Sequence, residues 1–348
     1  MKKWSKWIAM MLLVMLLAAC SQGAPESSGA SGGGESNDGP KKYAFVFKNT
    51  GNPYGEKMLD GFESTIKELG GEVILRSPDQ PTAEGQIQII EQLITQKVDV
   101  IAVAGNDPDA LEPALKKAKD QGIKVLSVDS AVNAASRDIH VNQANPERIG
   151  RVQIEAVSEM IDGEGQIAVL SATSQATNQN TWIEWMKKEL EKEDYKDIEL
   201  VKVAYGDDLR DKSVSETEAL LKSYPDLKAI IAPTTVGIAA AGKVLTDKGL
   251  EGQIALTGLG LPSEMATYIE SGVSPWMYLW NPIDVGKGAA YAAYELGEGN
   301  ITGELGEKVD LRDLGEVEVV EDGEGTQIML GDPFKFDETN IDEWKDVY

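Results

Sequence analysis

The sequence predicts an α/β fold of two similar doubly wound domains, each built on a parallel sheet. The 348 residues suffice for two domains of ordinary size. Short apolar runs alternate with amphipathic helical segments along most of the chain, which is typical of parallel βαβ units. Segments 98–129 and 228–258 share one order of strand, polar loop, alanine-rich helix, glycine and strand. This repetition indicates two similar domains and not one long sheet.

The first forty residues are expected to direct export and then to tether the protein. Three lysines precede twelve apolar residues at 8–19, which are too few to span a bilayer core of ~30 Å, so the pattern is that of a signal peptide. Leu-Ala-Ala-Cys, ending at Cys20, resembles a bacterial lipobox, whose cysteine is lipidated and becomes the mature N-terminus; the alternative is a plain signal peptide with an incidental cysteine. We expect a signal peptide at 1–19, a lipidated Cys20, a flexible linker to residue 40, and an extracytoplasmic protein anchored to the cell membrane.

The stretch 43–63 is expected to form the first strand, loop and helix of the first domain. Residues 43–47 have strand character, and a polar loop runs from Lys48 to Asn52. Asn52 stands at the expected N-cap, and Pro53 at the first helical position, where a missing N–H costs nothing. In open α/β sheets ligands bind at the carboxyl ends of the strands, so this loop is the first candidate site.

The same alternation continues to residue 258. Strands are expected at 73–75, 100–104, 124–128, 165–170, 199–205, 229–232 and 253–257, with helices between them.

The tail departs from this order. An apolar strand at 276–280 precedes Asn281 and a helix that Asp284 is expected to cap. An antiparallel hairpin is expected within 308–330, and a terminal helix at 337–344.

Several features argue against other functions. The formal net charge of −25 disfavours nucleic acid as a partner, because like charges repel. Cys20 is the only cysteine and His140 the only histidine, so an intrachain disulfide and most His-based metal sites are excluded.

A P-loop-like match at 237–244 ends in Val244, where a Mg²⁺-binding hydroxyl is required, so nucleotide binding is not expected. No residues supply a nucleophile, base and oxyanion hole together, so we expect neither an enzyme nor a cofactor or metal. Four loop acids lack the spacing of a calcium loop and are interpreted as helix caps: Asp107, Asp109, Asp207 and Asp208.

From about residue 41 to the C-terminus, the chain resembles type I solute-binding proteins of ABC sugar importers. The phrases that carry the likeness are PTAEGQIQIIEQLI, NDPDALEPALKKA, ATNQNTWI, YGDD, APTTVGIAA, TGLGLPSEMA and LWNPIDVG. Within that family it most resembles the L-rhamnose-binding proteins and the autoinducer-2 receptors. The resemblance implies two lobes, 41–143 plus 282–325 and 144–281 plus 326–348. It also implies three crossing segments, near 142–145, near Asn281 and near 326–329, with the sugar in the cleft between the lobes.

The resemblance also implies binding residues. Autoinducer-2 receptors surround their ligand with a lysine, an aspartate, an Asp-Gln pair, a proline and an alanine. The matching positions here are Lys48, Asp129, Asn178, Gln179, Pro233 and Thr235. Asparagine thus replaces one aspartate and threonine replaces alanine, as in the rhamnose-binding pattern. Loop position and sugar chemistry, which needs amides and aromatic platforms, add four further candidates: Asn52, Tyr54, Trp280 and Asn281.

The expected function is capture of a small neutral sugar, with L-rhamnose the first candidate. The lobes would close on the sugar and present it to a membrane permease and its ATPase, with the protein acting as a monomer. Two alternatives remain: a receptor for autoinducer-2, or a sugar sensor that presents its ligand-bound form to a membrane sensor protein.

Overall fold

The structure is a computed structural model that describes residues 39–348. The signal peptide, the lipidated Cys20 and nearly all of the linker predicted from the sequence lie outside the described residues. Residues 40–348 form one compact unit. Within the described residues, no helix has the length and apolar character needed to cross a membrane.

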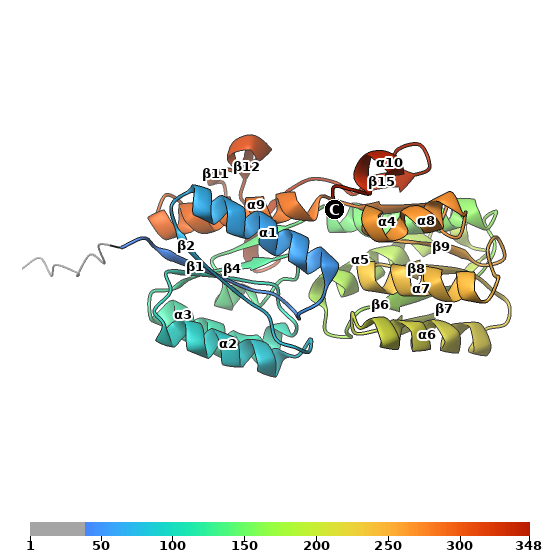
Figure 1. The fold of residues 1–348 in the computed structure, drawn as a ribbon, viewed down its shortest axis with the longest axis horizontal. Coiled ribbons are helices and arrows are strands. Elements are labelled where there is room, and N and C mark those ends of the chain that lie inside the picture. Colours follow the sequence, from blue (N-terminus) through green and yellow to red (C-terminus); the bar gives the residue numbers. More distant parts are fainter. Residues whose placement is uncertain (1–38) are drawn as a thin grey trace, which may run out of the picture. The chain divides into compact units, whose positions relative to one another are not determined.

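The first lobe is built on a seven-stranded sheet in the order β13-β14-β5-β4-β3-β1-β2. Figure 1 shows β1, β2 and β4 of this sheet between two layers of helices. All neighbouring strands are parallel except β13 and β14. The strands are β1 (Lys42–Val46), β2 (Glu72–Arg76), β3 (Val100–Val103), β4 (Lys124–Val128), β5 (Ile139–Asn142), β13 (Val320–Asp322) and β14 (Gly325–Met329). The predicted parallel βαβ arrangement is therefore confirmed for this lobe.

Helices cover both faces of this sheet because its strands carry apolar side chains on both sides. Tyr43 and Phe45 of β1 pack in the core with α1 (Pro53–Glu68) and α9 (Pro282–Glu298). Ala44 and Val46, which point the other way, pack with α2 (Ala83–Thr95) and α3 (Pro108–Asp120). Each of these four helices begins at a polar N-cap whose side chain accepts from the backbone: Asn52, Thr82, Asp107 and Asn281.

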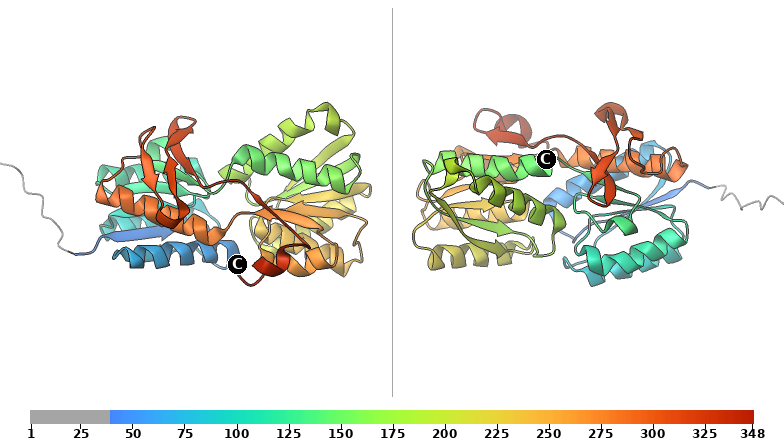
Figure 2. Two further views of the ribbon diagram at one scale, coloured as in Figure 1. Left: turned by 90° about the horizontal axis from the view of Figure 1, so that it is seen from above. Right: turned by 180° about the vertical axis from the view of Figure 1, so that it is seen from behind.

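The second lobe has a four-stranded parallel sheet in the order β7-β6-β8-β9. Figure 2 shows the two sheets side by side, each with its own helices. The strands are β6 (Gly165–Ser171), β7 (Ile198–Tyr205), β8 (Leu227–Ala232) and β9 (Ala255–Gly258). The helices are α4 (Pro146–Met160), α5 (Thr177–Leu190), α6 (Arg210–Ser223), α7 (Thr235–Asp247) and α8 (Pro262–Glu270). The repeated strand–helix order in the sequence thus corresponds to two similar sheets.

The tail forms smaller pieces, as its pattern predicts. β10 (Trp276–Leu279) pairs antiparallel with β15 (Phe334–Asp337), and an isolated bridge from Leu259 to Tyr278 attaches β10 to the second sheet. β11 (Lys308–Asp310) and β12 (Glu316–Glu318) pair antiparallel, as do β13 and β14. The predicted terminal helix is only one turn long, α10 (Ile341–Trp344).

The third crossing lies later in the chain than the sequence predicts. Gln327, Ile328 and Met329 pair in parallel with β5, so these residues extend the first sheet and do not leave it. The predicted boundary between residues 325 and 326 therefore falls inside β14, and the crossing occupies residues 330–333. Backbone hydrogen bonds from Leu330 N to Asn142 O (3.0 Å) and from Asn145 N to Gly331 O (2.9 Å) join this crossing to the first one.

Candidate functional site

A cavity with about 390 Å³ of empty space lies between the carboxyl ends of the two sheets. The first lobe supplies residues that follow β1 and β4, and the second lobe supplies residues that follow β6, β7, β8 and β9 or end β10. The lining residues are Phe47, Lys48, Asn52, Tyr54, Asp129, Asn178, Gln179, Trp182, Asp208, Pro233, Thr234, Thr235, Leu259, Leu279 and Trp280.

Asp129 is the centre of the polar network in this cavity. Its Oδ2 lies 3.4 Å from Lys48 Nζ, and both side chains are almost fully buried, 5% and 8% exposed. The Tyr54 hydroxyl donates to its Oδ1 (3.1 Å), and Asn178 Nδ2 of the second lobe donates to its Oδ2 (3.0 Å). The Asp129 backbone has a φ of 62°, a left-handed conformation that costs of order 1–3 kcal/mol in a residue other than glycine. The surrounding contacts therefore hold this carboxylate in a fixed position that touches both lobes.

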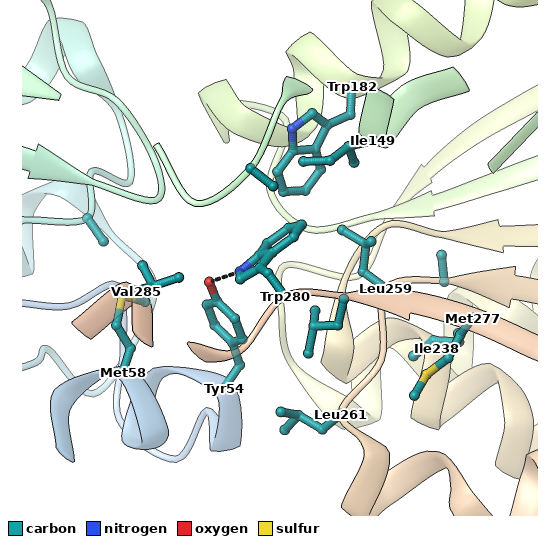
Figure 3. Packing of buried hydrophobic residues seen from close by; sticks show 14 of the residues in the cluster. Tyr54, Met58, Ile149, Trp182, Ile238, Leu259, Leu261, Met277, Trp280 and Val285 are labelled. Carbon is teal, nitrogen blue, oxygen red and sulfur yellow. Dashed lines mark hydrogen bonds between the residues drawn. The ribbon is translucent and has the colours of Figure 1, made fainter. Parts of the chain in front are cut away.

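Three aromatic side chains form one wall of the cavity (Figure 3). Trp280 Nε1 donates to the Tyr54 hydroxyl oxygen (2.7 Å), and the Tyr54 ring lies nearly perpendicular to the indole at a centroid distance of 6.3 Å. Trp182 packs edge-on against Trp280 at 5.8 Å. Burial, reinforced by the negative charge of Asp129, raises the pKa of Tyr54 well above its usual value. The phenol therefore keeps its proton and remains a donor, while the rings present an apolar surface.

Gln179 is held by the backbone and hydroxyl groups beneath it. Its Oε1 accepts from Ser171 Oγ and from Ala172 N, both at 2.7 Å, at the end of β6. The carboxamide oxygen is thus fully used, so the amide nitrogen is the group that Gln179 can offer to a ligand.

Asp208 lies in the cavity wall and not at a helix cap. Helix α6 has Leu209 at its N-cap and no side-chain capping bond, so the predicted capping role of Asp208 and of Asp207 is wrong. The Asp208 carboxylate accepts from the Thr234 hydroxyl. Burial raises the pKa of Asp208, and the nearby charge of Lys48 opposes this rise. Asp208 follows the carboxyl end of β7, at the sheet edge where the cavity lies, but it also precedes α6, so its place in the sequence fits a helix cap as well as a site residue.

Nine of the ten ligand-binding candidates from the sequence line this cavity: Lys48, Asn52, Tyr54, Asp129, Asn178, Gln179, Pro233, Thr235 and Trp280. Asn281 does not line it. Its side chain caps α9 by accepting from Ile283 N (3.0 Å), and it also donates to Asp284 (2.9 Å), so Asn281 and not Asp284 is the cap. Sequence reasoning did not assign six of the lining residues: Phe47, Trp182, Asp208, Thr234, Leu259 and Leu279.

Direct contacts beside the cavity hold the lobes together. The Ser130 and Thr177 hydroxyls lie 3.1 Å apart, and Thr177 Oγ1 donates to Ala131 O (2.9 Å). Together with the Asp129–Asn178 bond, they describe a closed arrangement of the two lobes. Chemically, the cavity offers fixed donors and acceptors, an aromatic surface and, within residues 39–348, no group of His, Cys, Asp and Glu arranged to hold a metal.

Comparisons with known proteins agree with this geometry. Residues 43–301 match the family described as the periplasmic binding protein domain. An ABC transporter solute-binding protein from Clostridium phytofermentas, solved with bound L-rhamnose, is 48% identical, with a TM-score of 0.87 over 89% of this chain and 99% of that chain. A D-ribose/D-allose-binding protein of Pseudomonas aeruginosa is 27% identical, covering 71% of this chain and 78% of its own length. LsrB from Clostridium saccharobutylicum in complex with AI-2 is 22% identical, with a TM-score of 0.81 over 87% of this chain and 99% of that chain, and shares the fold.

Proposed function

Because the chain belongs to the periplasmic binding protein family, whose members are sugar-binding proteins of ABC transporters and not enzymes, we propose that its own ligand is L-rhamnose. The observation that carries this proposal is the 48% identity, across nearly the whole length, with a solute-binding protein that holds L-rhamnose. The chain's partner in this role is the permease of an ABC transporter, as for the family.

The chemistry of the cavity supports a small neutral deoxysugar. L-Rhamnose carries hydroxyls, an apolar ring face and a methyl group. In the proposal, Asp129 accepts from hydroxyls through charge-assisted bonds, and Lys48 and Asn178 donate to the sugar oxygens. Tyr54 and Trp280 cover the apolar face. Pro233, Leu259 and Leu279 supply a region with little hydrogen-bonding capacity that suits the methyl group.

The proposed mechanism is capture by closure of the two lobes. An open form admits the sugar, and the lobes then rotate about the three crossing segments until the Asp129–Asn178 and Ser130–Thr177 contacts form. Because Asp129 contacts both the other lobe and the proposed sugar position, bound sugar and closed lobes stabilise each other. The closed form is the one delivered to the permease.

Calorimetry on residues 40–348 tests the ligand. We expect micromolar or tighter binding of L-rhamnose, and about tenfold or more weaker binding of L-mannose, which has a hydroxymethyl group where L-rhamnose has its methyl group. L-Fucose, a deoxysugar with a different hydroxyl arrangement, is the matched control for hydroxyl geometry. Tight binding of autoinducer-2 without binding of L-rhamnose would overturn the proposal.

We further propose that the protein is a monomer attached to the outer face of the cell membrane. In this proposal the signal peptide at 1–19 is removed and Cys20 carries the lipid, so that the linker holds the lobes near the permease. Mass spectrometry of the N-terminal peptide should find a diacylglycerol-modified Cys20, and Cys20→Ala should release the protein from the membrane fraction. An unmodified Cys20 in the mature membrane-bound protein would contradict the attachment.

A further inference from the structure

The acids that line the cavity between the sheets, Asp129 and Asp208, differ in how far the protein already satisfies them. Asp129 has protein partners on both carboxyl oxygens, with hydrogen-bond donors from each lobe. Asp208 accepts from the Thr234 hydroxyl through Oδ1, and its Oδ2 has no hydrogen-bond donor among residues 39–348. A carboxylate offers about four acceptor positions over its two oxygens. Asp208 therefore keeps more unused accepting capacity than Asp129.

A ligand in the cavity can reach this free oxygen. Asp208 lines the cavity and is only half-buried. Its Oδ2 is not one of the polar atoms within residues 39–348 that are sealed from solvent without a partner. The Thr234 hydroxyl is held in turn, because it accepts from Gly237 N (3.4 Å) at the start of α7. One oxygen of Asp208 is thus anchored to the second lobe, and the other remains available.

The turn after β7 fixes Asp208 at the cavity wall. Leu209 N donates to Gly206 O (2.9 Å), which closes a turn around Asp207 and Asp208. Both central residues have a left-handed backbone, with φ of 55° and 54°. Aspartate tolerates this conformation better than most residues, but it remains unfavourable, and strained residues of this kind gather at ligand sites. Asp207 N also donates to Ala172 O (3.1 Å), so the turn is joined to the loop after β6.

Lys48 acts on Asp208 from the other lobe without pairing with it. Burial raises the pKa of Asp208, and the positive charge of Lys48 opposes this rise, so the two groups are near enough to interact. Among residues 39–348, the Lys48 ammonium forms an ion pair with Asp129 (3.4 Å) but none with Asp208. An ammonium has three N–H donors, so Lys48 keeps donors unused. A hydroxyl is both an acceptor and a donor, and can therefore link Lys48 to Asp208.

We propose that Asp208 is a sugar-binding residue, whose Oδ2 accepts from a sugar hydroxyl that in turn accepts from Lys48. This inference rests on the proposed function. It adds a second point at which the lobes are joined, this time through the sugar, beside the direct Asp129–Asn178 contact. Because a hydroxyl donates to a carboxylate in a charge-assisted bond, the contact selects for sugars that carry a hydroxyl at this position.

Calorimetry on residues 40–348 with L-rhamnose and four analogues, each lacking the hydroxyl at C1, C2, C3 or C4, tests the assignment. Asp208→Asn keeps the shape of the side chain but replaces the free acceptor by an amide, and should weaken L-rhamnose binding about tenfold or more. The analogue that lacks the bridging hydroxyl should bind the parent and Asp208→Asn equally, because the contact is already absent. The other three analogues should be weakened by the substitution as L-rhamnose is. A residue that only maintains the shape of the site would not produce this selectivity.

Asp207→Asn is the matched control, because Asp207 has the same left-handed backbone but pairs with Lys212 and does not line the cavity. It should leave L-rhamnose binding unchanged. Asp208→Gly tolerates the left-handed backbone and removes the whole side chain. It should show the same selective loss, and provides a second test if the amide of Asp208→Asn still accepts from the sugar.

Two results would overturn the role of Asp208 and leave the proposed function standing. One is equal affinity of the parent and a folded Asp208→Gly for L-rhamnose. The other is the same proportional loss for L-rhamnose and all four analogues. Absence of L-rhamnose binding to the parent would overturn both the proposed function and the role of Asp208.

Discussion

Lys48→Met should destabilise the protein more than Asp129→Asn, because Lys48 balances two buried acids. Lys48 is the only cation among the cavity's lining residues, all of which belong to the described part of the chain, and it acts on both Asp129 and Asp208. Removing it leaves two buried carboxyls uncompensated, and breaking a buried pair costs about 3–5 kcal/mol. Asp129→Asn leaves Lys48 near Asp208 and keeps a side chain of the same shape beside Tyr54. We therefore expect a cost of about 1–3 kcal/mol for Asp129→Asn.

Urea unfolding at pH 7 measures both free energies of unfolding. Lys243→Met is the control, since Lys243 pairs with Asp247 on the surface with both side chains more than half exposed, and its loss should change stability by less than ~1 kcal/mol. An equal loss of stability in Asp129→Asn and Lys48→Met would show that Lys48 does not balance two acids. If both variants match the surface control, the buried charges do not depend on one another.

Three further predictions follow from the same network and its surroundings. Burial lowers the pKa of His140 to about 3, so the neutral imidazole stabilises the fold above its unfolded pKa of about 6.5, and this stability is lost as the pH falls. NMR at pH 5 should find this single imidazole neutral, and a titration midpoint near 6.5 would refute the prediction. Burial raises the pKa of Asp208, so the contribution of its carboxyl group to stability declines as the pH rises from about 4. In urea titrations between pH 4 and 7, Asp208→Asn should therefore gain stability relative to the parent protein, and a difference in unfolding free energy that does not change with pH would contradict this. Trp280→Phe removes the bond to Tyr54 but keeps a ring, so calorimetry should find sugar binding about twofold to tenfold weaker, and unchanged affinity would exclude that bond from the site.

The elements that carry a local signal were predictable from the sequence. Asn52-Pro53 marks the start of α1 because an N-cap and a proline at the first helical position act within a few residues. The position of Asp129 after a buried strand placed it at the carboxyl edge of the sheet, where the cavity lies. The aromatic wall was only partly predictable from the sequence. Trp182 lies on a helix with apolar neighbours, so core packing explains it as well as a role in a ligand site does.

The features that depend on pairing between distant segments were not predictable. Residues 326–329 have no local property that assigns them to either lobe, and only their register with β5 places them in the first sheet. Asp208 precedes a helix and so has the sequence position of a cap, but the Thr234 hydroxyl, from the loop after β8, fixes it in the cavity wall.

A crystal structure of residues 40–348 grown with L-rhamnose is the decisive test of sugar capture between the lobes. We expect one sugar in the cavity between the sheets, with hydroxyls hydrogen-bonded to Asp129 and to Asn178, and its apolar face on Tyr54 and Trp280. We also expect the Ser130–Thr177 contact between the lobes to be present. An empty cavity at saturating L-rhamnose, or a sugar bound without contact to Asp129, would refute L-rhamnose capture at this site.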